Sequence, residues 1–291
     1  MYQLKNGRFI TKLFGIFLAV LSLSLEAQAM TFRVCVDEQN TPPLLTSAPP
    51  STDLSSNTAS NQNMAINKVN TASGLLIDLM GYAINDLSLS LEVVRYPWQR
   101  CIAKFKSGDM DAIVGLVWQK EYEKWAVFPM QAGHPDDNYR LWNANYSIYV
   151  AKDSKIQWDG VNFDGLDKGA SAPQGLFIEN SLKYLQAFSS KLYIPADGLR
   201  LVSLHHLDAY VMETVQGRAL IKQHALEGQL KELAIPFADT SWFVPVSSKW
   251  AAKNPDLTRQ FWQALKQARI EYGPLLMESY EPRYSSLSSM Y

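Results

Sequence analysis

The sequence predicts an α/β fold with mostly parallel sheets, because it repeats a strand–helix–strand pattern. Residues 93–96 are β-branched and aromatic, as strands prefer, and Pro97 suits the first turn of a helix. Apolar residues then recur at helical spacing over 101–105, and Gly108 can end that helix in a left-handed conformation. Residues 112–117 form a short apolar run, which is typical of a strand buried on both faces.

Two strands joined by one helix are expected to lie parallel in a sheet that helices cover. Ligands of such sheets bind beyond the carboxyl ends of the strands. Trp98 and Arg100 follow the first of these strands, and residues 115–118 end the second. The sequence therefore predicts a ligand cleft beside these residues.

The same pattern continues along the chain. A first strand at 31–36 comes before a polar loop, and residues 74–87 form an amphipathic helix with one apolar face. A second strand follows at 89–96. The remaining expected elements are strands at 146–150, 170–175, 199–202, 218–221 and 242–246, and helices at 176–188, at 205–216 and from 254 onward.

The chain is expected to begin with a signal peptide, residues 1–29. Basic residues at positions 5, 8 and 12 precede an apolar stretch at 13–25, and small residues that suit a cleavage site follow. A membrane anchor is the competing interpretation, but a span needs about 20 apolar residues. We therefore expect a soluble exported protein. Because the formal net charge is −1 and no basic run is present, nucleic acid is not an expected partner.

Residues 46–73 stand apart in composition, being rich in Ser, Thr, Asn, Ala and Pro. Such a segment has too few large apolar residues to bury a core, so a mobile surface insertion is expected. A linker between two domains is the alternative, but only a single strand precedes it.

The two cysteines, Cys35 and Cys101, are expected to form a disulfide. Cys35 lies on the first strand, and Cys101 lies in the first turn of the helix after the second strand. These elements are neighbours in a parallel sheet, and export implies an oxidising compartment. By closing a long loop, the bond would stabilise the fold by roughly 4 kcal/mol. Two buried free thiols are the alternative.

Five segments, taken in order, carry a resemblance to a known family. They are FRVCVDEQNTPPL for the first strand, GLLIDLMGYAINDL for the first helix, YPWQRCIAKFKSGDMDAIVGL for the next helix and strand, VMETVQGRALI for a helix–Gly–Arg–strand segment, and KNPDLTRQFWQALKQARIEYG for the last helix. Their order and spacing resemble the bacterial periplasmic solute-binding proteins of the polar-amino-acid type, extracellular solute-binding protein family 3. The likeness covers the chain after residue 29, except for the insertion.

The resemblance implies a two-lobed periplasmic-binding-protein-like fold (type II), each lobe a mostly parallel sheet flanked by helices. Crossovers near 143–147 and 239–242 would leave a discontinuous lobe 1, residues 30–145 plus 241–291, and a lobe 2, residues 146–240. The implied function is capture of a small polar or aromatic, amino-acid-like solute between the lobes by hinge closure. A monomer without a cofactor would then deliver this small-molecule ligand to the membrane permease of an ABC transporter.

In lobe 1 the resemblance assigns ligand contacts to five residues. Asp37 corresponds to an acid near a ligand ammonium group, and Trp98 corresponds to an aromatic residue that stacks on the ligand. Gly115, Leu116 and Trp118 match a segment that meets the ligand with backbone amides and side chains. The alternatives are that Asp37 caps the turn after its strand and that Trp98 belongs to the core.

In lobe 2 the resemblance points to a turn at Gln174 and Gly175. Backbone amides at the start of the following helix can receive an anionic group there.

The sequence departs from the family within WQKEYEKWAVF. Amino-acid binders of this family carry an Arg in this segment that clamps the ligand carboxylate, but this chain has Tyr122 or Glu123 at that point. Tyr122 is the candidate ligand contact. Arg100, Lys120 or Lys124 could supply the missing charge, although Arg100 could equally be an exposed helix residue. A standard amino acid is therefore in doubt as the ligand.

Two other functions remain open. An enzyme on the same scaffold, such as a dehydratase of a cyclic acid, would need a cleft carboxyl group with a raised pKa, and Asp37, Glu121 and Glu123 are the candidates. A ligand sensor would act in trans on a membrane receptor. We expect neither catalysis nor a bound metal, because the four histidines lack metal-ligand spacing and no Gly-x-Ser-x-Gly or phosphate-loop motif is present.

Overall fold

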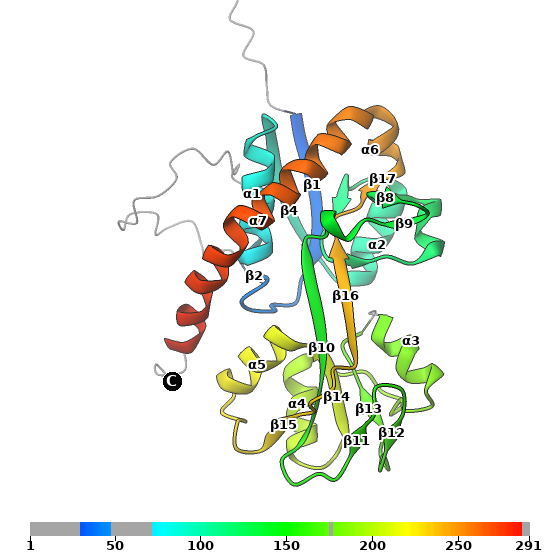
Figure 1. Ribbon diagram of the computed structural model, residues 1–291, viewed down its shortest axis with the longest axis vertical. Helices are drawn as coiled ribbons and strands as arrows, with labels where there is room; N and C mark the ends of the chain where they lie inside the picture. The colour runs from blue at the N-terminus through cyan, green and yellow to red at the C-terminus, as the bar shows by residue number, and fades with distance from the viewer. Residues whose placement is uncertain (1–29, 48–71, 175–176, 287–291) are drawn as a thin grey trace, which may run out of the picture.

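The computed structural model describes residues 30–47, 72–174 and 177–286. The expected signal peptide, Gly175 and all but the ends of the expected insertion lie outside these residues. Two α/β lobes lie end to end and are joined by two long strands, β10 (Trp142–Ala151) and β16 (Ala238–Phe243) (Figure 1).

The sheet of the first lobe has the strand order β4-β1-β5-β17-β7. β1 (Met30–Asp37) pairs in parallel with β4 (Leu89–Tyr96) on one side and with β5 (Ala112–Ile113) on the other. β17 (Val246–Ser247) and β7 (Ala126–Val127) extend the sheet in antiparallel pairing. The parallel arrangement predicted by the strand–helix–strand pattern is confirmed for the first three of these strands.

Helices α1 (Leu75–Asn85) and α2 (Trp98–Ser107) cover opposite faces of this sheet. Phe32 and Val34 of β1 belong to the core that includes α1. The next residue, Cys35, points to the other face of the sheet and belongs to the core that includes α2. The chain moves one way across the sheet through α1 and the other way through α2. Right-handed connections therefore put the two helices on opposite faces.

Cys35 and Cys101 form a disulfide, with their Cα atoms 5.7 Å apart. Both residues are fully buried. The predicted bond is thus confirmed, and it ties β1 to the first turn of α2. As predicted, α2 ends at Gly108 in the left-handed conformation.

The strand predicted at 112–117 is divided at a turn. β5 ends at Ile113, and β6 (Leu116–Val117) pairs instead with β16 in the second sheet. Gly115 lies between them with a φ of +83°, a conformation that favours glycine. Its Cβ, if present, would lie 3.4 Å from the ring of Trp242. A continuous strand is ruled out because the chain changes sheets here.

The second sheet has the order β13-β14-β10-β16-β6, with β15 also on β10. β13 (Ala170–Ser171) is parallel to β14 (Ala209–Glu213). β10 is antiparallel to β14, to β15 (Leu230–Glu232) and to β16. The sheet of this lobe is therefore mostly antiparallel, and not mostly parallel as expected. β10 enters the lobe and β16 leaves it, so these neighbours must run in opposite directions.

The strand predicted at 199–202 is wrong, because these residues lie in helix α4 (Pro195–Ser203). Pro195 occupies the first turn, where its missing N–H costs nothing, and Asp197 suits the positive end of the helix dipole. These start signals were available in the sequence.

The helix predicted at 205–216 and the strand predicted at 218–221 are also wrong. Residues 209–213 form β14, and helix α5 (Thr214–Gln223) follows at once. All five residues of β14 are buried, so apolar and polar residues do not alternate along the strand. The spacing of apolar residues therefore cannot distinguish a strand from a helix here.

The remaining helices are α3 (Phe177–Tyr184), α6 (Ser248–Lys253) and α7 (Pro255–Ser286). α7 lies beside α1 and extends away from the first sheet (Figure 1). The strand predicted at 242–246 is divided between the end of β16 and β17, because Pro245 cannot donate a ladder hydrogen bond.

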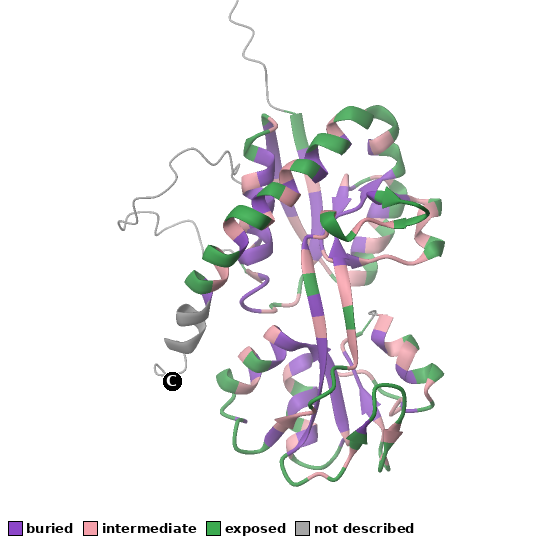
Figure 2. Cartoon of the chain, viewed as in Figure 1, coloured by how far each residue is buried: buried purple, intermediate pink, exposed green. Residues whose placement is uncertain are grey.

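Short elements complete the described fold. The ends of the expected insertion pair with each other as β2 and β3. Figure 2 shows that buried residues concentrate in the two sheets and on the helix faces toward them. The short elements are β2 (Thr46–Ser47), β3 (Ala72–Ser73), β8 (Met130–Gln131), β9 (His134–Pro135), β11 (Gln157–Trp158), β12 (Phe163–Asp164) and the 3₁₀ helices η1 (Lys120–Lys124) and η2 (Asp137–Tyr139).

Candidate functional site

A pocket lies between the two lobes and contains about 760 Å³ of empty space, part of it open to solvent. Residues from both sheets and from the strands that join them form its walls. These residues are Val36, Asp37, Gln39, Thr41, Leu45, Leu76, Trp98, Val114, Gly115, Tyr146, Pro173, Gln174, Pro195, Glu213, Gln216 and Trp242.

The first lobe contributes the carboxyl ends of its three parallel strands. Asp37 ends β1, Trp98 begins the helix after β4, and Gly115 follows β5. β1 lies between β4 and β5, so these three residues converge on one edge of the sheet. The pocket therefore lies where parallel sheets place their ligands.

Asp37 is a half-buried acid at this edge. Its Oδ1 accepts a hydrogen bond from the backbone N–H of Gln39 at 3.1 Å. Burial raises the pKa of Asp37, and the neighbouring Glu38 carboxylate acts in the same direction, whereas the hydrogen bond from Gln39 opposes both. Asp37 caps the turn, as one alternative predicted, and it also faces the pocket.

The second lobe contributes Glu213, whose position is set by a strand-to-helix junction. Glu213 ends β14 and is the N-cap of α5, where its Oε2 accepts a hydrogen bond from the backbone N–H of Gln216 at 2.9 Å. Only 3% of Glu213 is exposed. Burial raises the pKa of this carboxyl group to about 7, although the N–H groups at the start of α5 oppose the shift. The pocket thus holds a carboxyl group that titrates near neutral pH.

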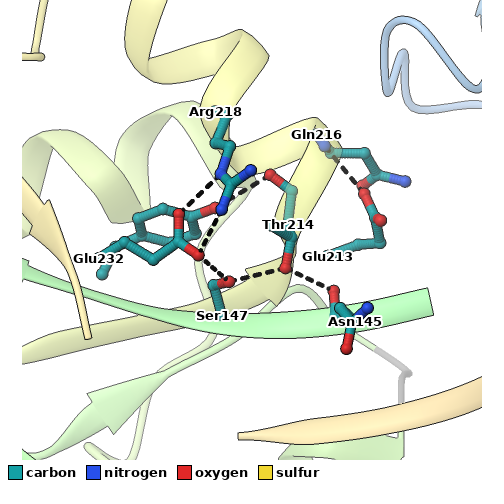
Figure 3. Close-up of polar contacts among 8 residues, drawn as sticks. Asn145, Ser147, Glu213, Thr214, Gln216, Arg218 and Glu232 are labelled. Carbon is teal, nitrogen blue, oxygen red and sulfur yellow. Dashed lines mark hydrogen bonds and ion pairs between the residues drawn. The ribbon is translucent and has the colours of Figure 1, made fainter. Parts of the chain in front are cut away.

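A polar network that extends from the buried Ser147 and Thr214 to the exposed Arg218 holds the start of α5 against the sheet (Figure 3). Ser147 Oγ lies 2.7 Å from Thr214 Oγ1 and donates to Glu232 Oε1 at 2.7 Å. Thr214 Oγ1 donates to the backbone oxygen of Asn145 at 2.8 Å. Arg218 completes the network with two hydrogen bonds to the Glu232 carboxylate, at 2.8 and 3.0 Å. β10, α5 and β15 are therefore locked together beside Glu213.

The strands that join the lobes contribute two aromatic side chains to the pocket. Trp242 of β16 donates from its indole Nε1 to the hydroxyl oxygen of Tyr146 of β10 at 3.0 Å. Tyr146 is fully buried, and burial raises the pKa of its phenol. Both rings line the pocket at the junction between the lobes.

The charged residues in the described lining of the pocket are all acidic. Among the described residues that line it, Asp37 and Glu213 are acidic, and no Lys, Arg or His is present. Arg95, at the end of β4, does not line the pocket: it donates to Ser47 Oγ and Asn40 Oδ1, each at 2.8 Å, and to the backbone oxygen of Glu38. Its charge still reaches Asp37 and acts to lower the pKa of that carboxyl group, against the larger effect of burial.

Four residues that sequence analysis assigned to the ligand are not among those lining the pocket. The Arg100 guanidinium lies 4.6 Å from the centre of the Tyr96 ring. Leu116 is buried in the core around α2. Trp118 donates from Nε1 to Glu123 at 3.3 Å, and Tyr122 packs with Trp125. Gln174 does line the pocket, and Gly175 lies outside the described residues.

The pocket also contains four residues that were not predicted from the sequence: Glu213, Gln216, Tyr146 and Trp242. The helix predicted at 205–216 placed Glu213 inside a helix, whereas Glu213 ends β14 and caps α5, with Gln216 in the first turn of α5. The signal was present, because residues 209–212 form a short apolar run of strand length that a capping residue follows. Tyr146 and Trp242 lie in predicted strands, but their orientation toward the pocket depends on how the lobes are joined.

Within the described residues, no group of three or more His, Cys, Asp or Glu side chains could hold a metal ion. No helix in the described part of the chain is long and apolar enough to cross a membrane.

Comparison with known proteins shows similarity in structure and not in sequence. No family model and no curated protein matches the sequence. Among solved structures, a histidine kinase sensor domain with similarity to periplasmic binding proteins has a TM-score of 0.63 at 17% identity, over 87% of this chain and 96% of that one. The amino acid ABC transporter substrate-binding protein AbpA from Streptococcus pneumoniae, bound to L-arginine, has a TM-score of 0.62 at 16% identity, over 89% and 95%.

A third similar structure is an ancestral amino-acid-binding protein, AncCDT-1, a precursor of cyclohexadienyl dehydratase. Its TM-score is 0.60 at 17% identity, over 86% of this chain and 95% of that one. These neighbours include a transport component, a sensor domain and the precursor of an enzyme. At such identities they establish the architecture alone: the chain has a two-lobed fold similar to that of periplasmic binding proteins.

Proposed function

We propose that the protein captures a small polar or aromatic solute in the pocket between its lobes. The observation that carries this proposal is the pocket lining: Asp37, Trp98 and Gly115 come from the first lobe, and Gln174 and Glu213 come from the second. A solute that touches both walls favours the state in which the lobes are together. Residues 30–145 plus 241–291 would form one rigid body and residues 146–240 the other.

Hinge motion would take place in the two strands that join the lobes. Both proposed boundaries fall within the paired segments of β10 and β16, where Tyr146 and Trp242 are hydrogen-bonded. In this proposal a monomer works in the periplasm, carries no cofactor and delivers the solute to the membrane permease of an ABC transporter. Leu116, Trp118 and Tyr122 would support the first wall from behind, through the core around α2.

A thermal-shift screen with amino acids, amines, organic acids and aromatic solutes tests this proposal. A solute that binds only the folded protein raises the melting temperature by mass action, and chromatography should recover it unchanged. Consumption of the solute would contradict a transport role. Loss of solute uptake in cells that lack the protein would support delivery to a permease, whereas unchanged uptake would favour a sensor that acts in trans on a membrane receptor.

A second candidate function is an enzyme on the same scaffold, and Glu213 favours it. A buried carboxyl group with a pKa of about 7 in a cleft can donate or accept a proton near neutral pH. Mass spectrometry of each solute after incubation separates the two functions. Turnover that the Glu213→Gln variant loses would support catalysis.

A further inference from the structure

We propose that the solute is an organic cation without a carboxylate, such as a primary amine or a guanidinium compound, held between Asp37 and Glu213. This inference rests on the proposed solute-binding function and names the class of ligand. The inference comes from the charged residues that the fold places around the pocket. The proposed ligand differs from an amino acid in one group, because it has no carboxylate.

The two carboxyl groups reach the pocket from different lobes. Asp37 ends β1 of the first sheet, and Glu213 ends β14 of the second sheet. A cation between them would make charge-assisted hydrogen bonds to both walls, which are about twice as strong as neutral ones.

Three arginines of the elements that flank the pocket each have partners outside it. Arg95 donates to Ser47, Asn40 and the backbone of Glu38. Arg100 is exposed and lies over the Tyr96 ring. Arg218 forms a two-point ion pair with Glu232, within the network that supports α5.

The consequence for an amino acid follows from these contacts. Its ammonium group would be attracted to the acids, but its carboxylate would enter a pocket whose described lining has two acids and no basic side chain. Removing a carboxylate from water without a counter-charge is costly, and like charges nearby add to that cost. The pocket therefore selects against the carboxylate.

The apolar part of the lining suits the same class of ligand. Trp98, Tyr146 and Trp242 present aromatic rings to the pocket, beside Leu45, Leu76 and Val114. Aromatic faces attract cations through their electron density, and they also cover the carbon chain of an alkyl or aryl amine.

The test compares amines with the amino acids from which they differ only by a carboxylate. The probes are agmatine and arginine, cadaverine and lysine, and tyramine and tyrosine, each added to the full-length protein in calorimetric titrations and thermal-shift assays. At least one amine should bind at least 10-fold more tightly than its amino acid. Absence of binding by all three amines would overturn the proposal, and so would an amino acid that binds as tightly as its amine.

An amino acid or organic acid that binds as tightly as the amines would overturn only this inference, because solute capture would stand and the turn at Gln174 would become the candidate anion site. No binding of any solute in the wider screen would overturn the proposed function as well.

Variants connect the binding to the two acids. Asp37→Asn and Glu213→Gln should each weaken amine binding about 10-fold or more, because each removes one charge-assisted hydrogen bond. Asp137→Asn and Glu227→Gln make the same chemical changes at exposed positions outside the pocket and should leave affinity unchanged. Unchanged affinity in both pocket variants, with their melting curves still cooperative, would contradict the proposal.

Discussion

The carboxyl group of Glu213 accepts a hydrogen bond from the backbone N–H of Gln216 at 2.9 Å, and both residues line the pocket between the lobes. A helix N-terminus favours an ionised carboxylate, yet burial raises the pKa of Glu213 from 4.5 to about 7. The effect of burial on the pKa of Glu213 is therefore larger than the opposing effect of the helix N-terminus. A cation bound beside Glu213 would favour the ionised form of this carboxyl group.

The raised pKa of Glu213 predicts a pH dependence of stability. The folded state holds this proton more tightly than the unfolded state does, so the contribution of Glu213 to stability is greatest below pH 4.5. The free energy of unfolding should then fall by roughly 3 kcal/mol as pH rises from 4.5 to about 7. Asp37 and Asp111, whose pKa values are also raised by burial, act in the same direction. Urea unfolding across this range measures the total.

The Glu213→Gln variant isolates the contribution of Glu213. Its free energy of unfolding should fall less over this pH range than that of the wild type, whereas Glu227→Gln should follow the wild type. Equal pH dependence in all three proteins would contradict the assignment.

Gly217 should not tolerate a side chain. A Cβ at Gly217 would lie 2.4 Å from the ring of Tyr149, which is fully buried and donates to the backbone oxygen of Thr214 at 3.0 Å. Gly217→Ala should therefore destabilise the protein by about 1–3 kcal/mol, despite the better helix propensity of Ala. Gly228→Ala is the matched control, because its Cβ would have open space. Chemical denaturation compares the two, and equal stabilities would show that Tyr149 can move aside.

The Cys35–Cys101 disulfide closes a loop with a sequence separation of 66 residues. On the chain-entropy model its removal should cost about 4 kcal/mol of unfolding free energy. Urea unfolding with and without reductant measures this loss. The Cys35→Ser/Cys101→Ser protein is the control, since reductant should not affect its stability.

Trp98 should contribute to binding through its aromatic face. Trp98→Leu should weaken the binding of an amine about 10-fold, whereas Trp98→Phe should retain part of the affinity, because a phenyl ring still attracts a cation. Calorimetric titration measures both. Equal losses in the two variants would mean that the size of Trp98 matters and its ring does not.

The first lobe could largely be predicted from the sequence, because its signals are local. Pro97, Gly108 and the apolar spacing between them define α2, and the two cysteines link β1 to α2. The change of sheet at Gly115 could not be predicted, since it depends on pairing between β6 and β16, which is distant in sequence.

The second lobe was harder to predict, because its strands are short and buried. β14 has five buried residues, so apolar period alone cannot distinguish it from a helix. Because of that error Glu213 was not predicted as a pocket residue, although it is the acidic residue that the second lobe contributes to the described lining. Of the residues predicted to touch the ligand, Asp37, Trp98, Gly115 and Gln174 line the pocket, but their contacts with a ligand stay predictions.

Hydrogen–deuterium exchange, measured by mass spectrometry with a saturating solute from the screen, tests most directly whether both lobes hold the ligand. Amide exchange should slow in two places: around the end of β1 and the start of α2, and around the junction of β14 and α5. Slower exchange in only one lobe, or in neither lobe at saturation, would contradict capture between the lobes.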